Sequence, residues 1–214
     1  MNETTRNGSL FIVSGPSGAG KSALVGRVLG LVSNVRFSVS YTTRAPRGAE
    51  RHGVEYNFIS RDEFQNLIDG NDLLEWAEVH GNRYGTSGGF VESILQNGED
   101  VLLDIDVQGA RTVREKRADA VGIFILPPSF QALRERLERR SLDDGIVIEQ
   151  RLRRARKEIN HYGEYDYLIV NRELQSSTRE LESIIRSTRC RMAAQIAAAK
   201  SIAATFGGMN AEDP

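Results

Sequence analysis

The chain has 214 residues, of which 40% are hydrophobic and 27% charged, values typical of a globular protein. Its 28 basic and 29 acidic side chains give a formal net charge of −1, which excludes a generally cationic coat, and we expect no nucleic-acid partner. The single cysteine, Cys190, excludes an internal disulfide. No apolar run reaches the length of a membrane span, so we expect no membrane partner and a cytoplasmic protein.

Short apolar runs along the chain predict buried parallel strands at Leu10–Ser14, Val101–Ile105, Val121–Leu126 and Tyr167–Val170. Helical patterns separate these runs, beginning with residues 21–32. Strands that alternate with helices are typical of an α/β fold with a parallel sheet flanked by helices.

Two segments interrupt this alternation. Residues 37–89 hold short β-like pieces around one small helix, which begins with the capping-box pattern Ser60-x-x-Glu63. Residues 129–161 indicate two arginine-rich helices around a loop at Ser141–Gly145. A final helix is expected from about Ser177 to Phe206. The tail after it, residues 207–214, is expected to be disordered. We therefore expect core segments at 1–36, 90–128 and 162–214, with insertions at 37–89 and 129–161.

The first strand is followed by a complete phosphate-loop motif, G-x-x-x-x-G-K-[ST]. Its glycines allow successive backbone N–H groups to point at phosphate oxygens, and the next helix adds the positive end of its dipole. Lysine in this motif reaches the β- and γ-phosphates of a nucleotide, and the following serine hydroxyl binds Mg²⁺. The motif residues are Gly15, Pro16, Ser17, Gly18, Ala19, Gly20, Lys21 and Ser22.

Asp104 stands near the end of the second predicted strand. Proteins with a phosphate loop hold Mg²⁺ through an acid at such a strand end. The sequence therefore predicts a magnesium site formed by Ser22 and Asp104, with water as a possible bridge. A helix cap is the alternative role for Asp104.

The first insertion carries side chains suited to a second phosphate. Arg44 and Arg47 lie three residues apart in SYTTRAPR, and paired guanidiniums bind a phosphate dianion well. Tyr56 and Tyr84 add phenolic donors. Glu75 is an acid inside the apolar run LLEWAE, which is costly without a partner.

At this point the chain resembles the guanylate kinase family. The resemblance rests on GPSGAGKS (15–22), SVSYTTRAPR (38–47), EYNFIS (55–60), LLEWAEVHGNRYGTS (73–87), VLLDIDVQGA (101–110), IFILPPS (123–129) and EYDYLIVN (164–171). It implies a P-loop NTPase core with an inserted GMP-binding β lobe at 37–89 and a helical lid at 129–161. The implied activity is transfer of the ATP γ-phosphoryl group to GMP, and to dGMP, with Mg²⁺.

The resemblance also implies residue roles. The GMP phosphate would be held by Arg44, Arg47, Tyr56 and Tyr84, and the guanine read by Ser40, Glu75, Thr86 and Asp106. Adjacent donors on guanine, N1–H and N2–H₂, suit a carboxylate, whereas adenine offers no such pair. For ATP, the resemblance implies that Asn171 lies near the adenine and that the lid arginines Arg136, Arg140 and Arg151 reach the phosphates. The catalytic set is then Lys21, Arg44, Arg136, Arg140 and Arg151.

The sequence departs from the family pattern in two places. Arg139-Arg140-Ser141 stands where the family often has Gly-Arg-Gly, which affects the lid hinge and the role of Arg140. Arg172-Glu173 follows Asn171, where acids are usual.

Three other functions remain open at this stage. One is a P-loop kinase acting on a ribose bisphosphate, another is a non-catalytic guanylate-kinase-like binding module, and the third is a P-loop regulatory switch. The guanine-reading set argues against a sugar acceptor, and the complete phosphate loop argues against a binding module. The sequence leaves open whether the protein is a monomer or a homo-oligomer.

Overall fold

The computed structural model describes residues 7–79, 81–140 and 145–206. A five-stranded parallel sheet lies at its centre, in the order β2-β7-β1-β8-β9. Its strands are β1 (Leu10–Ser14), β2 (Val35–Phe37), β7 (Asp100–Asp104), β8 (Val121–Leu126) and β9 (Tyr167–Val170). The expected α/β class is confirmed. The edge strand β2 was not predicted, because three residues with one buried side chain give no clear apolar run.

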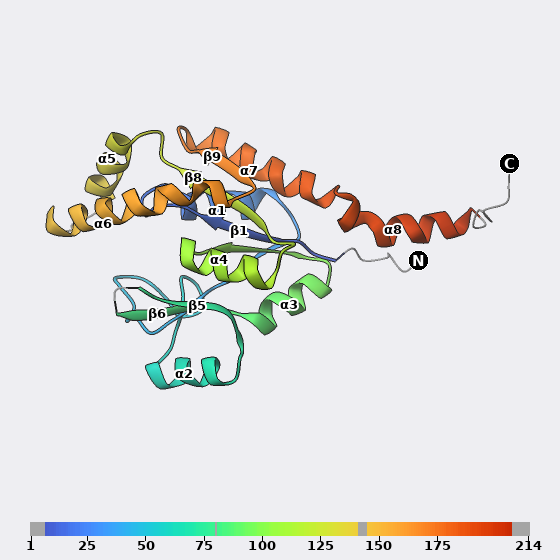
Figure 1. The fold of residues 1–214 in the computed structure, drawn as a ribbon, viewed down its shortest axis with the longest axis horizontal. Helices are drawn as coiled ribbons and strands as arrows, with labels where there is room; N and C mark the ends of the chain where they lie inside the picture. The colour runs from blue at the N-terminus through green and yellow to red at the C-terminus, as the bar shows by residue number, and fades with distance from the viewer. Residues whose placement is uncertain (1–6, 80, 141–144, 207–214) are drawn as a thin grey trace.

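Both faces of this sheet are covered by helices, so its strands are apolar on both sides. Side chains of β1 alternate between the two faces: Phe11 and Val13 pack with α1 and α7, whereas Leu10 and Ile12 pack with α3 and α4. These helices are α1 (Lys21–Leu31), α3 (Gly88–Gln96), α4 (Val107–Lys116) and α7 (Leu174–Arg189). Figure 1 shows this layered arrangement.

A second sheet lies beside α3 and α4 and has the order β4-β3-β6-β5. Its strands are β3 (Tyr41–Thr42), β4 (Asn57–Phe58), β5 (Leu73–Val79) and β6 (Asn82–Ser87). Helix α2 (Arg61–Asp69) lies beyond it, on the side away from the five-stranded sheet (Figure 1). The predicted capping box is confirmed, since Ser60 and Glu63 exchange both side-chain-to-backbone hydrogen bonds.

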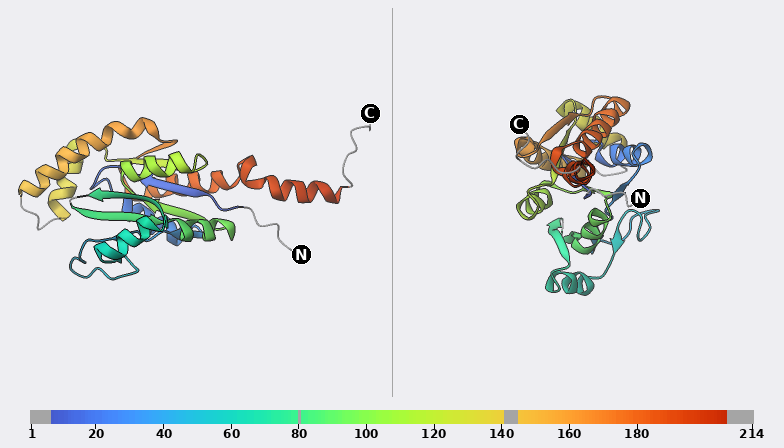
Figure 2. Two further views of the ribbon diagram at one scale, coloured as in Figure 1. Left: turned by 60° about the horizontal axis from the view of Figure 1, so that its bottom comes forward. Right: turned by 90° about the vertical axis from the view of Figure 1, so that its right-hand side faces the viewer.

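Two further helices, α5 (Phe130–Arg140) and α6 (Gly145–Glu158), lie together at one end of the molecule (Figures 1 and 2). Buried Leu133, Leu137, Ile148 and Leu152 hold them to one another. A 3₁₀ helix, η1 (Ile159–Glu164), leads from α6 to β9. Most of the expected loop, residues 141–144, lies outside the described residues, and Gly145 is the first residue of α6.

The predicted single C-terminal helix is wrong. Helix α7 begins at Leu174, so Ser177 is a buried helical residue and not a cap, and the chain breaks before α8 (Met192–Thr205). The break occurs because Arg191 is extended, and the Gln195 side chain donates to the carbonyl that Arg189 leaves open. Helix α8 projects from the end opposite α5 and α6 (Figures 1 and 2). The tail 207–214 lies outside the described residues.

None of the described helices is both long enough and apolar enough to cross a membrane.

Candidate nucleotide-binding site

The phosphate loop joins the carboxyl end of β1 to the amino end of α1. Gly20 has a positive φ of 98°, which L side chains rarely adopt, and it lies against the Asn171 side chain. Lys21 Nζ donates to the carbonyl of Gly15 at 2.7 Å, so the lysine folds back over the loop. This geometry is that of a preformed anion-binding loop ahead of a helix N-terminus.

Ser22 and Asp104 meet at the edge where parallel strands β1 and β7 end. The Ser22 hydroxyl donates to Asp104 Oδ2 at 3.1 Å, and Lys21 Nζ lies 3.9 Å from Asp104 Oδ1. A hydroxyl and a carboxylate beside a phosphate loop are hard oxygen donors of the kind Mg²⁺ prefers. The residues therefore fit a magnesium ion.

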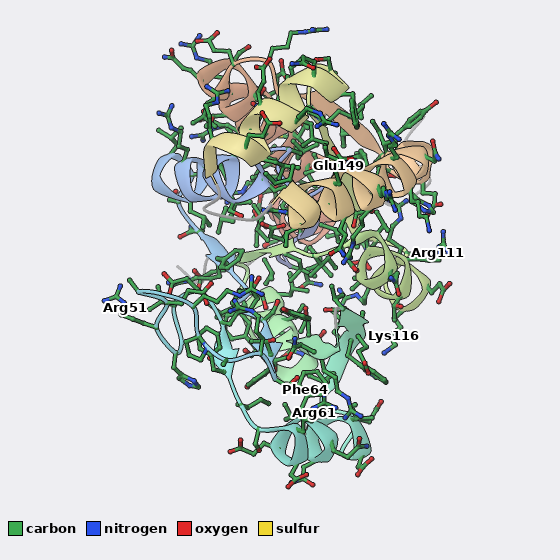
Figure 3. The ribbon with its side chains drawn as sticks, turned by 90° about the vertical axis from the view of Figure 1, so that its left-hand side faces the viewer. Arg51, Arg61, Phe64, Arg111, Lys116 and Glu149 are labelled. Atoms are coloured by element: carbon green, nitrogen blue, oxygen red, sulfur yellow. The ribbon has the colours of Figure 1, made fainter. Side chains whose placement is uncertain are left out.

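One cavity of about 840 Å³ connects this loop to the second sheet. Its walls include Lys21 and Ser22 from α1, Glu75 from β5, and Arg151 from α6. Figure 3 views the molecule from the end that carries α5 and α6, with Glu149 on α6 above and Phe64 on α2 below. The other expected site residues on the wall are Gly15, Ser17, Gly18, Gly20, Ser40, Arg47, Tyr56, Tyr84, Asp104 and Asp106.

The four residues expected to hold a phosphate lie together in the second sheet and its connecting loop. The Tyr56 and Tyr84 rings contact edge to face, with centroids 5.7 Å apart, and the Arg44 guanidinium lies 5.3 Å from the Tyr56 ring centre. Burial raises the pKa of Tyr56 above its ordinary value of 10, so its hydroxyl stays protonated and able to donate. Arg47 is exposed on the cavity wall.

Arg44 is already paired, with a residue that the sequence did not single out. Its guanidinium contacts both carboxylate oxygens of Glu50, at 2.9 and 3.0 Å. Hydrogen bonding to Glu50 is the main cause that raises the pKa of Arg44, and Arg44 in turn lowers the pKa of Glu50. The only sequence signal for this contact is an acid three residues after Arg47 in the same loop.

Glu75 and Asp106, the carboxylates expected to read the guanine, both line the cavity between the phosphate loop and the second sheet. Glu75 is only 4% exposed, and its Oε1 accepts a 2.6 Å hydrogen bond from the Thr86 hydroxyl. Burial raises the pKa of Glu75 to about 7, although the Thr86 hydrogen bond opposes this shift. Asp106 caps α4, since its Oδ1 accepts from the backbone N–H groups of Gln108 and Gly109.

Gly109 allows these two carboxylates to lie close to α4. A Cβ at this position would lie 2.7 Å from Glu75 Oε2, closer than real Cβ contacts. The sequence carried no signal for this role, because the contact joins α4 to β5.

The arginines expected in the lid reach the core from α5 and α6. Arg151 donates to the Ser17 hydroxyl at 3.0 Å, and Arg136 donates to the backbone carbonyls of Ala19 and Asn171. The Arg140 side chain lies outside the described part of the chain, as does His80. Arg154, three residues after Arg151 and so on the same helix face, was missed; it pairs with Asp106 at 3.1 Å.

Asn171 belongs to the far side of the phosphate loop. Its buried amide donates to the Ala19 carbonyl at 2.8 Å. It lines a second cavity of about 380 Å³, together with Gly18, Gly20, Ala23, Arg136, Arg139 and Leu174. The phosphate loop therefore separates two cavities, a larger one towards the second sheet and a smaller one towards α5.

A phosphate loop between a parallel strand and a helix, with basic side chains reaching it from other segments, defines the class of P-loop phosphate-binding α/β proteins. A family model for guanylate kinase matches residues 7–188. The chain is 48% identical to a guanylate kinase from Alcanivorax borkumensis, over 89% of this chain and 92% of the relative. It is 50% identical to a guanylate kinase from Hahella chejuensis, over 88% of this chain and 90% of that relative.

A solved structure of guanylate kinase from Anaplasma phagocytophilum is 32% identical in sequence. It superposes with a TM-score of 0.79, over 96% of this chain and 98% of that one. The chain belongs to the guanylate kinase family.

Proposed function

We propose that this protein transfers the γ-phosphoryl group of ATP to GMP or dGMP, giving ADP and the corresponding diphosphate. One observation carries the proposal: a single cavity joins the phosphate loop to a buried carboxylate, Glu75, and to Arg47 and Tyr56 of the second lobe. A site for a donor phosphate and a site for a guanine nucleotide thus open on the same space.

On the donor side, the phosphate loop at residues 15–22 binds the ATP phosphates through the backbone N–H groups of its residues other than Pro16, with Lys21 at the β- and γ-phosphates. Arg136, Arg140 and Arg151 add positive charge from α5 and α6. Asn171 lines the smaller cavity, where we place the adenine. Ser22 and Asp104 hold Mg²⁺, which supplies further neutralisation of the phosphate charge when bound.

On the acceptor side, Arg44, Arg47, Tyr56 and Tyr84 bind the GMP phosphate. The carboxylates of Glu75 and Asp106 accept the guanine N1–H and N2–H₂ donors. Ser40 adds a polar group to the cavity wall, and Thr86 contributes to reading the guanine by holding the Glu75 carboxylate. AMP would leave the buried Glu75 carboxylate without these donors. Sites built on such hydrogen bonds reject analogues that lack the group by large factors.

The transfer itself needs position and charge more than covalent help from the protein. An oxygen of the GMP phosphate attacks the γ-phosphorus, and the bond to the β–γ bridging oxygen breaks as ADP leaves. Arg44 and the lid arginines offset the charge that must gather between the two nucleotides.

The two insertions have separate roles in this proposal. Residues 37–89 form the GMP-binding lobe, and residues 129–161 form a lid that closes over the core segments 1–36, 90–128 and 162–214. Closure keeps water from accepting the phosphoryl group. We place the protein in the cytoplasm, with no nucleic-acid partner, as a monomer or a homo-oligomer.

The test is ADP release from Mg-ATP with GMP, AMP, CMP, UMP and ribose bisphosphate as separate acceptors. We expect strong turnover with GMP. Turnover with ribose bisphosphate instead would identify a sugar kinase. Folded protein that binds GMP but turns over no acceptor would be a binding module. Either result would overturn the proposal.

A further inference from the structure

The carboxylate of Glu50 contacts both arginines that the proposed function assigns to the acceptor phosphate. Its Oε1 accepts from Arg44 Nη2 at 3.0 Å, its Oε2 lies 2.9 Å from Arg44 Nη1, and Oε2 also accepts from the backbone N–H of Arg47 at 2.8 Å. The backbone N–H of Glu50 returns a hydrogen bond to the Arg47 carbonyl at 3.1 Å. One side chain thus closes the loop that carries Arg44 and Arg47.

The Arg44 guanidinium is held at several points. Its Nη2 donates to Glu50 Oε1 at 3.0 Å, and its Nη1 lies 2.9 Å from Glu50 Oε2 and donates to the Ala45 carbonyl at 2.8 Å. A hydrogen bond with the Tyr84 side chain also contributes to the raised pKa of Arg44. A guanidinium carries five N–H donors in a rigid fork that matches phosphate oxygens in pairs, so holding it in place also orients these donors.

The Arg44 side chain is also held by its neighbours. It is only 10% exposed, and its guanidinium lies 5.3 Å from the Tyr56 ring centre and 5.7 Å from that of Phe58. An arginine fixed before the ligand arrives loses less conformational freedom on binding than a free one. The positive charge of Arg44 also offsets repulsion between the Glu50 carboxylate and a phosphate bound by the same arginine.

We propose that Glu50 is a positioning residue for the acceptor phosphate: it holds the Arg44 guanidinium in place for the phosphate, and it fixes the loop at Arg47. The proposal rests on the proposed function, in which these arginines bind the phosphate of GMP. It concerns the phosphate and not the base, and this difference provides the test.

The experiment compares equilibrium binding of GMP with that of guanosine, which lacks the phosphate. The proteins are the wild type, Glu50→Gln and Glu50→Ala. The matched control is Glu55→Gln, because Glu55 also accepts from a backbone N–H in the same loop, that of Arg51, at 2.8 Å. Arg51 lies at the outer edge of this loop and points away from the body of the protein (Figure 3).

For Glu50→Gln and Glu50→Ala we expect the GMP dissociation constant to rise about tenfold or more. The guanosine constant should stay within about twofold of wild type, and Glu55→Gln should leave both constants unchanged. In steady state the GMP KM should rise in the same way, whereas the ATP KM should not.

Three results would overturn the proposal. Equal weakening of GMP and guanosine would mean that Glu50 only stabilises the lobe. Unchanged GMP binding would mean that Arg44 needs no support. Tighter GMP binding would mean that Glu50 competes with the phosphate. A wild-type protein that binds GMP without forming GDP would overturn the proposed function alone, because the Glu50 comparison measures binding.

Discussion

Thr86 and Glu75 face each other across strands β5 and β6, and the Thr86 hydroxyl donates to Glu75 Oε1 at 2.6 Å. Because the two residues are register partners in an antiparallel pair, the sheet itself fixes the position of the carboxylate. Both side chains are buried. The proposed acceptor site therefore has a carboxylate whose orientation is set by the sheet.

The first prediction is a pH dependence of guanine binding. Burial raises the pKa of Glu75 to about 7, and the N–H donors of guanine bind its ionised form. Below pH 7 the empty site must lose a proton before binding, so affinity falls by up to about tenfold per pH unit; above pH 8 it is flat. Guanosine is the ligand to use, because a phosphate monoester itself titrates near pH 6. Affinity that stays constant from pH 5.5 to 8 would contradict this role for Glu75.

The second prediction concerns Gly109→Ala. The added methyl group would lie 2.7 Å from Glu75 Oε2, and Thr86 holds the other oxygen, so the carboxylate must move. We expect the GMP KM to rise about tenfold or more while the ATP KM stays unchanged. Gly26→Ala in α1 is the control, since nothing lies within 4 Å of its added methyl group. An unchanged GMP KM in Gly109→Ala would show that Glu75 is not confined.

The third prediction concerns the contact between α6 and Asp106. Arg154 Nη2 donates to Asp106 Oδ2 at 3.1 Å, while the cap of α4 holds Oδ1. Arg154→Met releases one oxygen of a carboxylate assigned to the base, so we expect the GMP KM to rise about threefold to tenfold. Arg153→Met, an exposed neighbour on α6, is the matched control. Equal effects of the two substitutions would point to a general charge effect of the lid.

The fourth prediction concerns stability far from the site. The Asp100 carboxylate is fully buried at the start of β7, where Arg189 Nε donates to it at 2.7 Å and Arg189 Nη2 donates to the Ser33 carbonyl. Arg189→Met removes this guanidinium from a buried carboxylate, which costs about 3 kcal/mol. Tm should fall by about 6–12 °C in a chain of this length, with KM values unchanged.

The control for that measurement is Arg36→Met. Arg36 makes an exposed ion pair with Glu99 at the same end of the sheet. Exposed pairs contribute little to stability, so we expect Tm to stay close to wild type. If Arg36→Met and Arg189→Met lowered Tm equally, burial of Asp100 would not explain the effect.

The sheet was predictable because the buried parallel strands consist of continuous apolar residues. Residues 10–14, 121–126 and 167–170 match β1, β8 and β9 residue for residue. The C-terminal region was not predictable in the same way. Its break at Arg191 depends on backbone conformation and on the Gln195 cap, and Ser177-x-x-Glu180 imitates a capping box inside a helix.

Some residues of the candidate site were predictable from the sequence and others were not. The phosphate loop is one continuous motif, so its residues could be named from spacing alone. Gly109 and Arg154 could not, because each acts through a contact between distant segments: Gly109 with Glu75 and Arg154 with Asp106. Glu50 lies near Arg47 in sequence, but only the fold of the loop shows that its carboxylate pairs with Arg44.

In the proposed function Glu75 selects the guanine nucleotide, and a single product analysis measures this selection. Wild-type protein and Glu75→Gln are each given Mg-ATP labelled at the γ-phosphate and an equal mixture of GMP, AMP, CMP and UMP. We expect labelled GDP alone from the wild type. In Glu75→Gln an amide N–H₂ donor replaces one carboxylate oxygen acceptor, so the amount of labelled GDP formed should fall at least about 100-fold. Undiminished GDP formation by Glu75→Gln, or labelled ADP from the wild type, would contradict the account.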